Sequence, residues 1–226
     1  MKIIARIETQ YKEKFGIPRQ SGIAEDSIGL IVFEPEYRVA EAVRGLSEFS
    51  HVWLLWEFSE AKRESWSPTV RPPRLGGNRR VGVFATRSPY RPNPIGLSSV
   101  RLLGVEMTER GPVLRVAGAD LLDGTPIYDI KPYVPYADSH PDAIGGFSDG
   151  VRDYALAVEI PDALASRIPM QDRDAVRAVL AHDPRPSYQT DPDRVYYLKY
   201  GTLEYSFTVR DGVLTVCGVS EIASSQ

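Results

Sequence analysis

Apolar and polar residues alternate through the first two-thirds of the chain in a pattern that predicts β-strands. Seven segments are rich in Val, Ile, Leu and aromatic residues, and turn residues bound most of them. These segments are Lys2–Glu8, Ile28–Phe33, His51–Phe58, Arg80–Ala85, Leu97–Val105, Val113–Ala117 and Pro126–Ile130. Helical spacing predicts a helix over Glu36–Leu46, with Gly45 near its end. Many short strands with almost no helix between them favour an antiparallel barrel or sandwich.

The pattern changes after about Gly150. Apolar residues at helical spacing predict one or two helices over Pro161–His182, interrupted at Pro169. Strict alternation over Leu203–Val209, a turn at Asp211-Gly212 and a return over Val213–Val219 predict a hairpin. The sequence therefore predicts a mainly β protein, with an antiparallel β-barrel domain over residues 1–150 and a small α+β domain over residues 151–226.

Composition is that of an ordinary globular protein. The chain has 226 residues and no apolar run that approaches the roughly 20 residues of a membrane span. Its single cysteine, Cys217, excludes a disulfide framework within the chain and fits a reducing cytoplasm. We expect Cys217 to be a small buried residue of the last strand. With only three histidines besides, no zinc-ligand spacing is present, and no metal is expected.

Arginines are concentrated in one part of this acidic chain. The net charge is −3, yet no acidic residue lies between Glu64 and Glu106. The stretch contains Arg71, Arg74, Arg79, Arg80, Arg87, Arg91 and Arg101. Guanidinium groups suit phosphate because they offer a planar fork of donors, so the stretch predicts a local contact with an anionic partner. The alternative is a solvated surface with a chance bias toward arginine.

Three prolines stiffen the segment Ser88–Pro94 inside this stretch. Each proline fixes its own φ and disfavours helical geometry in the residue before it, which orients nearby side chains at low entropic cost. Arg91 for a phosphate, Asn93 for a base edge and Tyr90 for stacking form a plausible set for reading a nucleotide. The alternative is a purely structural turn.

A turn at Asp123-Gly124 precedes another candidate site. If the following residues are extended, alternation places Ile127, Asp129 and Lys131 on one face of a strand. Asp129 and Lys131 can then serve as acid–base and charge-stabilising groups in a cleft. A structural ion pair beside the turn is the alternative.

Several common catalytic and nucleotide-binding motifs are absent from the sequence. It contains no G-x-G-x-x-G loop after a strand, no G-x-x-x-x-G-K-[ST] loop and no G-x-S-x-G nucleophile elbow. Any nucleotide cofactor is therefore bound without the usual Rossmann loop.

The chain resembles the TrmO-type tRNA methyltransferases, which carry a TsaA-like β-barrel domain. The resemblance covers most of residues 1–140, and Asp183–Pro186 with Tyr188 extends it toward the C-terminus. The motifs that carry it are Lys12–Phe15, Pro18–Gln20, Val70–Gly77, Gly82–Ser88, Arg91–Gly96, Asp123–Pro126 and Asp129–Tyr133.

The resemblance implies methylation of N6 of threonylcarbamoyl-adenosine, just 3′ of the anticodon of certain tRNAs, notably those for threonine. It also implies S-adenosylmethionine as cofactor, an antiparallel β-barrel fold, a homodimer, and tRNA as partner through its anticodon arm. By motif position, the cofactor contacts are Pro18, Arg19, Gln20, Ser59, Glu60, Arg87, Leu97, Leu122, Asp123, Gly124 and Thr125. Relatives often have histidine where this chain has Ser59, a difference that a contact through the backbone would tolerate.

Roles for the remaining candidates follow from the resemblance. Arg71, Arg74, Arg79 and Arg80 would hold phosphates of the anticodon arm, and Tyr90, Arg91 and Asn93 the target nucleotide. A carbonyl attached to N6 makes the N–H more acidic, so a modest base suffices. Our hypothesis is that Asp129 or a neighbouring residue accepts or relays that proton, with Lys131 stabilising the developing negative charge.

Two other classes of function stay open on the sequence alone. One is a tRNA- or S-adenosylmethionine-binding module without catalysis, which only the change at Ser59 favours. The other is a metal-independent hydrolase acting on a nucleotide-like ligand, for which no nucleophile–base pair is evident. In each case we expect a cytoplasmic protein that does not span a membrane.

Overall fold

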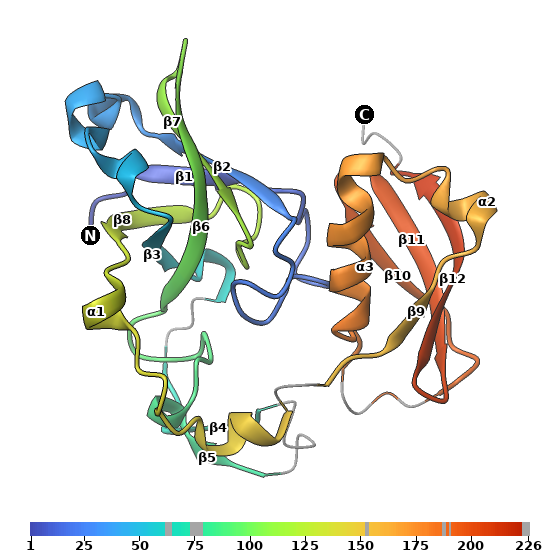
Figure 1. Cartoon of the computed structure of the whole chain (residues 1–226). Helices are drawn as coiled ribbons and strands as arrows, with labels where there is room; N and C mark the ends of the chain where they lie inside the picture. The colour runs from blue at the N-terminus through green and yellow to red at the C-terminus, as the bar shows by residue number, and fades with distance from the viewer. Residues whose placement is uncertain (62–64, 73–78, 152–153, 187–188, 190, 223–226) are drawn as a thin grey trace.

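The N-terminal part of the chain forms a closed antiparallel β-barrel (Figure 1). The structure is a computed structural model that describes all residues except 62–64, 73–78, 152–153, 187–188, 190 and 223–226. Arg74 and Tyr188 therefore lie outside the described residues. Around the barrel the strands follow the order β1 (Ala5–Glu8), β2 (Ile28–Phe33), β7 (Gly111–Ala117), β6 (Ile95–Thr108), β3 (His51–Glu57) and β8 (Pro126–Pro132). The predicted mainly β fold with an antiparallel barrel is confirmed.

Strict alternation along β3 shows how the sequence fills the barrel. Val52, Leu54 and Trp56 are buried, whereas the residues between them are partly exposed. Successive side chains of a strand point to opposite faces, so the buried set lines the interior. It packs with residues such as Ile7 and Val100 in one apolar core.

A β-bulge changes the faces on which the residues of β8 lie. Leu55 of β3 pairs with Asp129, but the next residue, Trp56, pairs with Ile127, so Tyr128 is an extra residue. Ile127 consequently points inward and is buried, while Asp129 and Lys131 share the face opposite. The prediction that all three residues lie on one face is wrong for Ile127.

The predicted helix over Glu36–Leu46 is also wrong. Three short 3₁₀ turns occupy this region, at η1 (Pro35–Tyr37), η2 (Ala40–Val43) and η3 (Leu46–Glu48). Val43 is the only buried residue of these turns. Without a continuous apolar face to bury, a helix of this length does not repay the cost of its nucleation.

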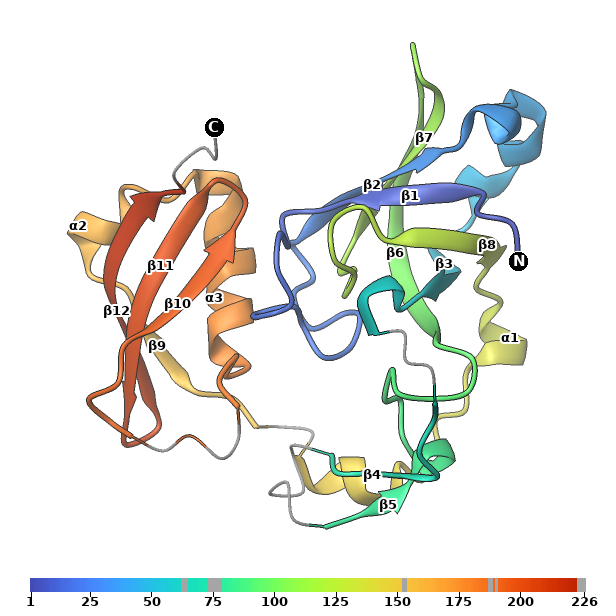
Figure 2. The same ribbon diagram turned by 180° about the vertical axis from the view of Figure 1, so that it is seen from behind.

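The predicted strand over Arg80–Ala85 is shorter than expected. Only β5 (Val81–Gly82) is extended, and it pairs with β4 (Thr69–Val70) as a two-stranded ribbon. The 3₁₀ turn η6 (Val83–Ala85) follows directly. In Figures 1 and 2 the ribbon lies beyond one end of the barrel, away from the tip of the β6–β7 hairpin.

A second unit is built from the C-terminal residues. Its sheet has the order β10 (Tyr196–Tyr200), β11 (Leu203–Arg210), β12 (Val213–Glu221) and β9 (Ala157–Glu159), with β9 parallel to β12. Helix α3 (Arg173–Ala181) lies against one face of the sheet (Figure 2) and buries Val176, Val179 and Leu180. A shorter helix, α2 (Asp162–Ala165), and the 3₁₀ turn η8 (Met170–Asp172) precede it, so the predicted interruption at Pro169 is confirmed.

The predicted hairpin is confirmed by β11 and β12. Asp211 and Gly212 join the strands at φ angles of 51° and 79°, the left-handed values that a type I′ turn requires. Cys217, however, is exposed rather than buried. Ser206 pairs with Gly218 while the next residue of β11 pairs with Val216, so Cys217 is the extra residue of a bulge.

The loop between β1 and β2 connects the two units. Tyr11 and Ala24 belong to the apolar core of the C-terminal unit, and Ile17 packs against it. The Tyr200 hydroxyl donates a hydrogen bond of 3.1 Å to Ser27 Oγ, which fixes the far end of the loop. No helix among the described residues is long and apolar enough to cross a membrane.

Candidate functional site

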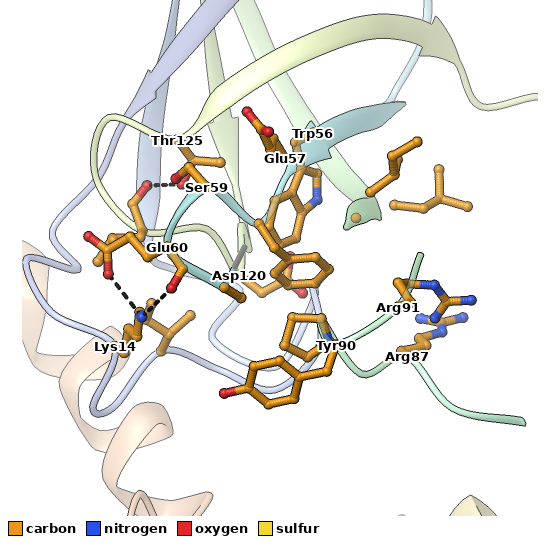
Figure 3. Close-up of a pocket in the computed structure, with 18 of the residues that line it drawn as sticks. Lys14, Trp56, Glu57, Ser59, Glu60, Arg87, Tyr90, Arg91, Asp120 and Thr125 are labelled. Carbon is orange, nitrogen blue, oxygen red and sulfur yellow. Dashed lines mark hydrogen bonds and ion pairs between the residues drawn. The ribbon is translucent and has the colours of Figure 1, made fainter. Parts of the chain in front are cut away.

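A pocket of about 750 Å³ opens beside the barrel (Figure 3). Four segments that are far apart in the sequence line it: the loop 14–20, the end of β3 with η4 (Ser59–Ala61), the segment 86–97 and the loop 120–125. The fold thus gathers the loop that packs on the C-terminal unit with three loops at the ends of barrel strands.

Trp56 is the largest apolar side chain of the pocket. Its ring lies 4.2 Å from that of Phe58, centroid to centroid, and its Nε1 donates a hydrogen bond of 3.0 Å to Ser98 Oγ. A Cβ atom added to Gly96 would lie 2.2 Å from this ring, so only glycine fits there. These contacts hold the indole in a single position.

Charged and polar side chains tie the lining loops together. The Arg87 guanidinium donates a hydrogen bond to Gln20 Oε1, which links the segment 86–97 to the loop 14–20. Lys14 lies 3.2 Å from Glu60 Oε2 and also donates to the Glu60 carbonyl oxygen at 2.9 Å. Figure 3 draws the Lys14–Glu60 contacts at the rim of the site.

The proline-rich segment owes its shape to local hydrogen bonds as well as to its prolines. Thr86 Oγ1 donates to the Val83 carbonyl at 2.8 Å and accepts from the Ser88 N–H at 3.2 Å. Arg91 donates to the Thr86 carbonyl oxygen at 2.9 Å. Tyr90, Arg91 and Asn93 all line the pocket, as expected of residues that hold a nucleotide.

Asp120 is a pocket residue that the sequence did not single out. Its Oδ1 accepts a hydrogen bond of 2.6 Å from Ser98 Oγ. Burial raises the pKa of Asp120 above its usual range, although the hydrogen bond from Ser98 and the charge of Arg87 act in the opposite direction. A carboxylate with a raised pKa in a pocket is typical of a functional site.

Most of the predicted cofactor residues meet in this pocket. Those that line it are Pro18, Arg19, Gln20, Ser59, Glu60, Arg87, Leu97, Leu122 and Thr125. Asp123 and Gly124 lie instead at a smaller hollow of about 330 Å³ on the side of the barrel. The pocket thus unites segments whose nearness the sequence pattern alone did not establish.

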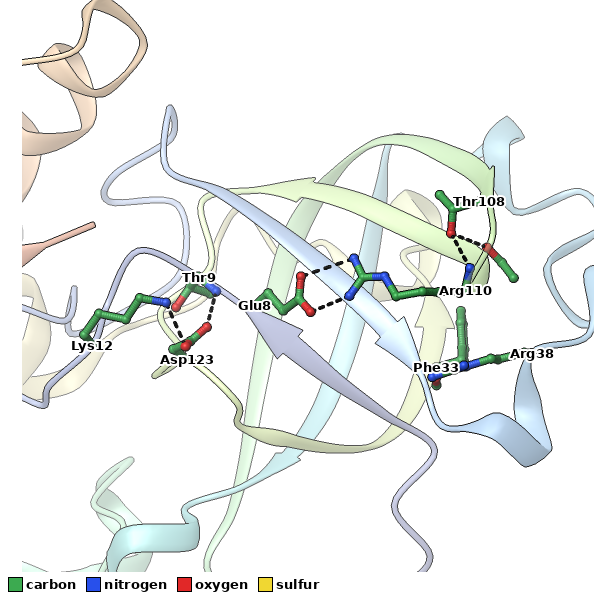
Figure 4. Close-up of polar contacts among 9 residues, drawn as sticks. Glu8, Thr9, Lys12, Phe33, Arg38, Thr108, Arg110 and Asp123 are labelled. Atoms are coloured by element: carbon green, nitrogen blue, oxygen red, sulfur yellow. Dashed lines mark hydrogen bonds and ion pairs between the residues drawn. The ribbon is translucent and has the colours of Figure 1, made fainter. Parts of the chain in front are cut away.

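Asp123 and Gly124 have structural contacts of their own (Figure 4). Asp123 accepts hydrogen bonds from the Thr9 N–H at 2.9 Å and from Lys12 Nζ at 2.8 Å. Gly124 has a φ of 75°, a left-handed value that favours glycine. Both residues therefore shape the turn that presents Leu122 and Thr125 to the pocket.

The hollow beside Asp123 is lined by charges that pair with one another. Arg110 forms a two-pronged contact with Glu8, 2.6 Å at its shorter distance, and Arg6 lies 3.0 Å from Glu34. Arg38 donates to the Phe33 carbonyl oxygen at 2.9 Å (Figure 4). These pairs bind the barrel strands to the turns that follow them.

Asp129 and Lys131 do not line the pocket. Lys131 Nζ lies 3.0 Å from Asp129 Oδ2 on the outer face of the barrel, and both side chains are substantially exposed. Asp129 and Lys131 thus form a surface ion pair, which is the alternative role that the sequence left open. Their part in proton transfer stays a prediction.

The arginines expected at the tRNA phosphates flank the β4–β5 ribbon. Arg71 directly follows β4, Arg79 and Arg80 directly precede β5, and all three are exposed. Arg80 donates a long hydrogen bond, 3.4 Å, to Thr69 Oγ1 across the ribbon. Arg74 lies outside the described residues, so its prediction has no structural counterpart.

Sequence reasoning missed Lys14, Trp56, Glu57, Phe58 and Asp120 as pocket residues. Trp56 and Phe58 gave the signal of an apolar strand, which predicts burial but not a binding site. Asp120 lies two residues before the Leu122–Thr125 motif, and no motif assigns it to the pocket.

The lining residues match the chemistry of S-adenosylmethionine. Arg19 and Arg87 offer guanidinium donors for a carboxylate, while Glu57, Glu60 and Asp120 offer negative charge for the ammonium and sulfonium groups. Ile95, Leu97 and Leu122 offer apolar contacts for an adenine ring. Among the described residues, no group of three or more His, Cys, Asp or Glu side chains could hold a metal ion.

Sequence comparisons place both units in one family. The family model described as the tRNA-methyltransferase O N-terminal domain matches residues 6–139, and the TrmO C-terminal domain matches residues 153–222. A tRNA (adenine(37)-N6)-methyltransferase of Escherichia coli strain K12 is 44% identical over 192 residues, which are 82% of each chain. A Pseudomonas aeruginosa protein named a putative S-adenosylmethionine-dependent methyltransferase is 43% identical over 89% of this chain and 88% of its own.

Solved structures point to the same family as the sequence comparisons. A crystal structure of TrmO from Pseudomonas aeruginosa superposes with a TM-score of 0.78 at 35% identity and covers 97% of this chain and 96% of its own. The matched family models, the identity to these relatives and the shared fold extend over both units and include the pocket. The chain belongs to the tRNA-methyltransferase O family.

Proposed function

We propose that this protein is an S-adenosylmethionine-dependent methyltransferase that methylates N6 of adenosine 37 in tRNA. The nucleoside it takes would already carry the threonylcarbamoyl group. The observation that carries the proposal is the pocket, which gathers most residues of the family's cofactor motifs with Tyr90, Arg91 and Asn93 at a single opening. The names of the relatives from E. coli and Eikenella corrodens support the reaction and the position in the tRNA.

The protein's main contribution would be placement. The cofactor supplies a methyl group that is already strongly electrophilic, so aligning N6 with it lowers much of the barrier. Arg91 and Asn93 would orient the nucleotide from a loop held by the hydrogen bonds of Thr86. Asp129 would accept or relay the N6 proton, and Lys131, 3.0 Å from it, would stabilise the negative charge.

Methyl transfer to bulk tRNA tests the proposal. The protein is incubated with methyl-labelled S-adenosylmethionine and bulk tRNA, and the tRNA is digested to nucleosides. Label is expected in threonylcarbamoyl-adenosine, and tRNA that lacks the threonylcarbamoyl group is the matched control. Cofactor binding without label would support a non-catalytic module instead, and a cleaved nucleotide product would support a hydrolase.

We also infer that the protein works as a homodimer in the cytoplasm. The family resemblance implies the dimer, and apolar side chains exposed near the ribbon support it. Phe84 is 71% exposed and Trp66 is 51% exposed, with ring centroids 6.1 Å apart. Paired exposed aromatic rings of this kind are typical of an interaction surface.

A further inference from the structure

Asp120 lies in the loop that follows β7, and its side chain faces the pocket. It lines the pocket with Trp56 and Arg87, and accepts from Ser98 of β6 (Figure 3). Neither the motifs nor the relatives' names assign it a role. Its surroundings show what the carboxylate is suited to bind.

The hydrogen bonds at Ser98 fix the direction in which its proton points. The indole Nε1–H of Trp56 can only donate, so Ser98 Oγ is the acceptor of that bond at 3.0 Å. The Ser98 hydroxyl proton is therefore directed to Asp120 Oδ1, 2.6 Å away. Ser98 is 1% exposed, so this chain of bonds is sheltered from water and keeps Asp120 an acceptor at that oxygen.

The negative charge on Asp120 is only partly compensated by the protein. Burial raises the pKa of its carboxyl group, and Ser98, the Ser21 backbone and the Arg87 charge only reduce that rise. Arg87 also donates a hydrogen bond to the neutral amide of Gln20, which ties its guanidinium to the loop 14–20. A cation that enters the pocket next to Asp120 would complete the compensation, because opposite charges attract strongly where water is excluded.

One difference in charge separates the cofactor from its product. S-adenosylmethionine carries a sulfonium cation, whereas S-adenosylhomocysteine carries a neutral thioether and is otherwise the same apart from the methyl group. We propose that Asp120 is the residue by which the pocket prefers the sulfonium cofactor to its neutral thioether product. The proposal rests on the function proposed above, since it needs the cofactor in this pocket, and it implies that transfer of the methyl group itself weakens binding and promotes product release.

Calorimetric titration of the full-length protein with each ligand tests the proposal. Asp120→Asn removes the charge but keeps an oxygen that can accept from Ser98. We expect the variant to bind S-adenosylmethionine on the order of tenfold more weakly, equivalent to one pKa unit of interaction. S-adenosylhomocysteine should bind almost as it does to the unaltered protein.

Asp172→Asn is the matched control. The pKa of Asp172 is also raised by burial, but this residue lies in η8 of the C-terminal unit and does not line the pocket. Both affinities should be unchanged in it. If Asp120→Asn weakens both ligands equally, Asp120 binds the shared ammonium group or only shapes the pocket, and the proposal is overturned.

A second measurement needs no variant. As the pH falls through the raised pKa of Asp120, the carboxyl group becomes neutral and the preference for the sulfonium should decline. The other charged or titratable groups around the pocket are Tyr11, Lys14, Arg19, Glu57, Glu60, Arg87, Tyr90 and Arg91. These groups also act on the parts that S-adenosylmethionine and S-adenosylhomocysteine have in common. Such effects change both affinities equally and cancel when one affinity is divided by the other. A ratio constant down to about pH 4, the ordinary aspartate range, would overturn the proposal even if the variant does not fold.

Failure of the proposed function gives a different result. If neither ligand binds the unaltered protein, the pocket is not the cofactor site, and both proposals are overturned. If both ligands bind with equal affinity at neutral pH, only the role of Asp120 is overturned. A further outcome is that Asp120→Asn keeps the preference for S-adenosylmethionine and that the preference still declines with acid. That result would assign the preference to Glu57 or Glu60 and would likewise overturn the proposal.

Discussion

For Asp129 and Lys131, the residue type alone does not define the function, because it depends on the surroundings of the side chains. Their contact of 3.0 Å lies on the outside of the barrel, and both side chains are well exposed to solvent. Exposed ion pairs contribute about 0–1 kcal/mol to stability, so this pair is not needed to hold the fold. A change at Asp129 therefore separates an effect on catalysis from an effect on folding.

We predict that Asp129→Asn lowers the rate of methyl transfer about 100-fold, the lower end of what a general base contributes. The melting temperature should hardly change, because the side chain is exposed. Single-turnover transfer of label to tRNA measures the rate, and Glu106→Gln, an exposed acid on β6, is the control. Full activity in Asp129→Asn with an intact fold would remove Asp129 from the mechanism and leave it as a surface ion pair.

At the residue scale, the motifs named side chains that meet in one pocket, whereas the sequence missed residues whose place depends on burial. Pro18, Gln20 and Arg87 were placed by their motifs, and they meet in the pocket. Asp120 has no such signal of its own, because its raised pKa comes from elements that are distant in sequence. Ile127 was misplaced for a similar reason. The side of the strand on which it lies depends on a β-bulge that pairs it with Trp56, and the sequence does not show this bulge.

Among the elements, the loop between β1 and β2 connects the cofactor motif to the C-terminal unit. Gly16 has a φ of 88°, and a Cβ atom added there would lie 1.8 Å from Leu198 Cδ1 of β10. Gly22, in the same loop, has a φ of 80° but no atom within 4 Å of an added Cβ. The two glycines thus share a left-handed backbone and differ in packing alone.

We predict that Gly16→Ala destabilises the protein more than Gly22→Ala does. Both variants incur the left-handed penalty of about 1–2 kcal/mol. Only Gly16→Ala adds an overpacking cost of about 1–3 kcal/mol, since Leu198 must move. Denaturant unfolding measures the difference, and titration with S-adenosylmethionine should show weaker binding for Gly16→Ala because Pro18–Gln20 shift with the loop. Equal stability of the two variants would contradict the tight packing at Gly16.

Alternation predicted the C-terminal hairpin, whereas helical spacing predicted the helical region Pro161–His182 correctly and failed over Glu36–Leu46. The hairpin of β11 and β12 follows directly from its alternating residues and the Asp211-Gly212 turn. Glu36–Leu46 has apolar residues at helical spacing, but Val43 is the only residue buried in its 3₁₀ turns. Helical spacing predicts a helix only where a partner surface covers the apolar face, and the sequence does not show that surface.

The β4–β5 ribbon carries a prediction about tRNA binding. Arg79 and Arg80 are exposed beside β5, and removing one arginine–phosphate interaction should reduce the slope of log affinity against log salt by about 1. We expect the double variant Arg79→Gln, Arg80→Gln to bind tRNA more weakly with a flatter slope. Arg44→Gln is the control, since Arg44 is 79% exposed in its side chain and lies in the segment of 3₁₀ turns, away from the ribbon in Figures 1 and 2. An unaltered slope in the double variant would rule out phosphate binding by these two residues.

At the scale of the whole molecule, the loop between β1 and β2 joins the barrel to the core of the C-terminal unit. Tyr11 lies in the apolar core of the C-terminal unit, and its ring meets that of Tyr200 edge-on at 5.5 Å. The C-terminal unit therefore supports the loop that carries the cofactor motif, a role that its own sequence pattern did not suggest. Among the described residues, η6 and the segment before β4 leave two large apolar side chains, Phe84 and Trp66, exposed.

These exposed rings lead to a prediction about assembly. If Phe84 lies in the interface of a homodimer, Phe84→Ser should shift the protein from dimer to monomer, because a buried aromatic side chain typically contributes about 2 kcal/mol or more at an interface. Light scattering after size-exclusion chromatography measures the mass. Met107→Ser is the control: Met107 is 64% exposed near the tip of the β6–β7 hairpin, beyond the other end of the barrel. A dimer that survives Phe84→Ser but dissociates in Met107→Ser would move the interface to the hairpin. Phe84 would then be an exposed side chain outside the interface, two residues before Thr86 of the pocket lining.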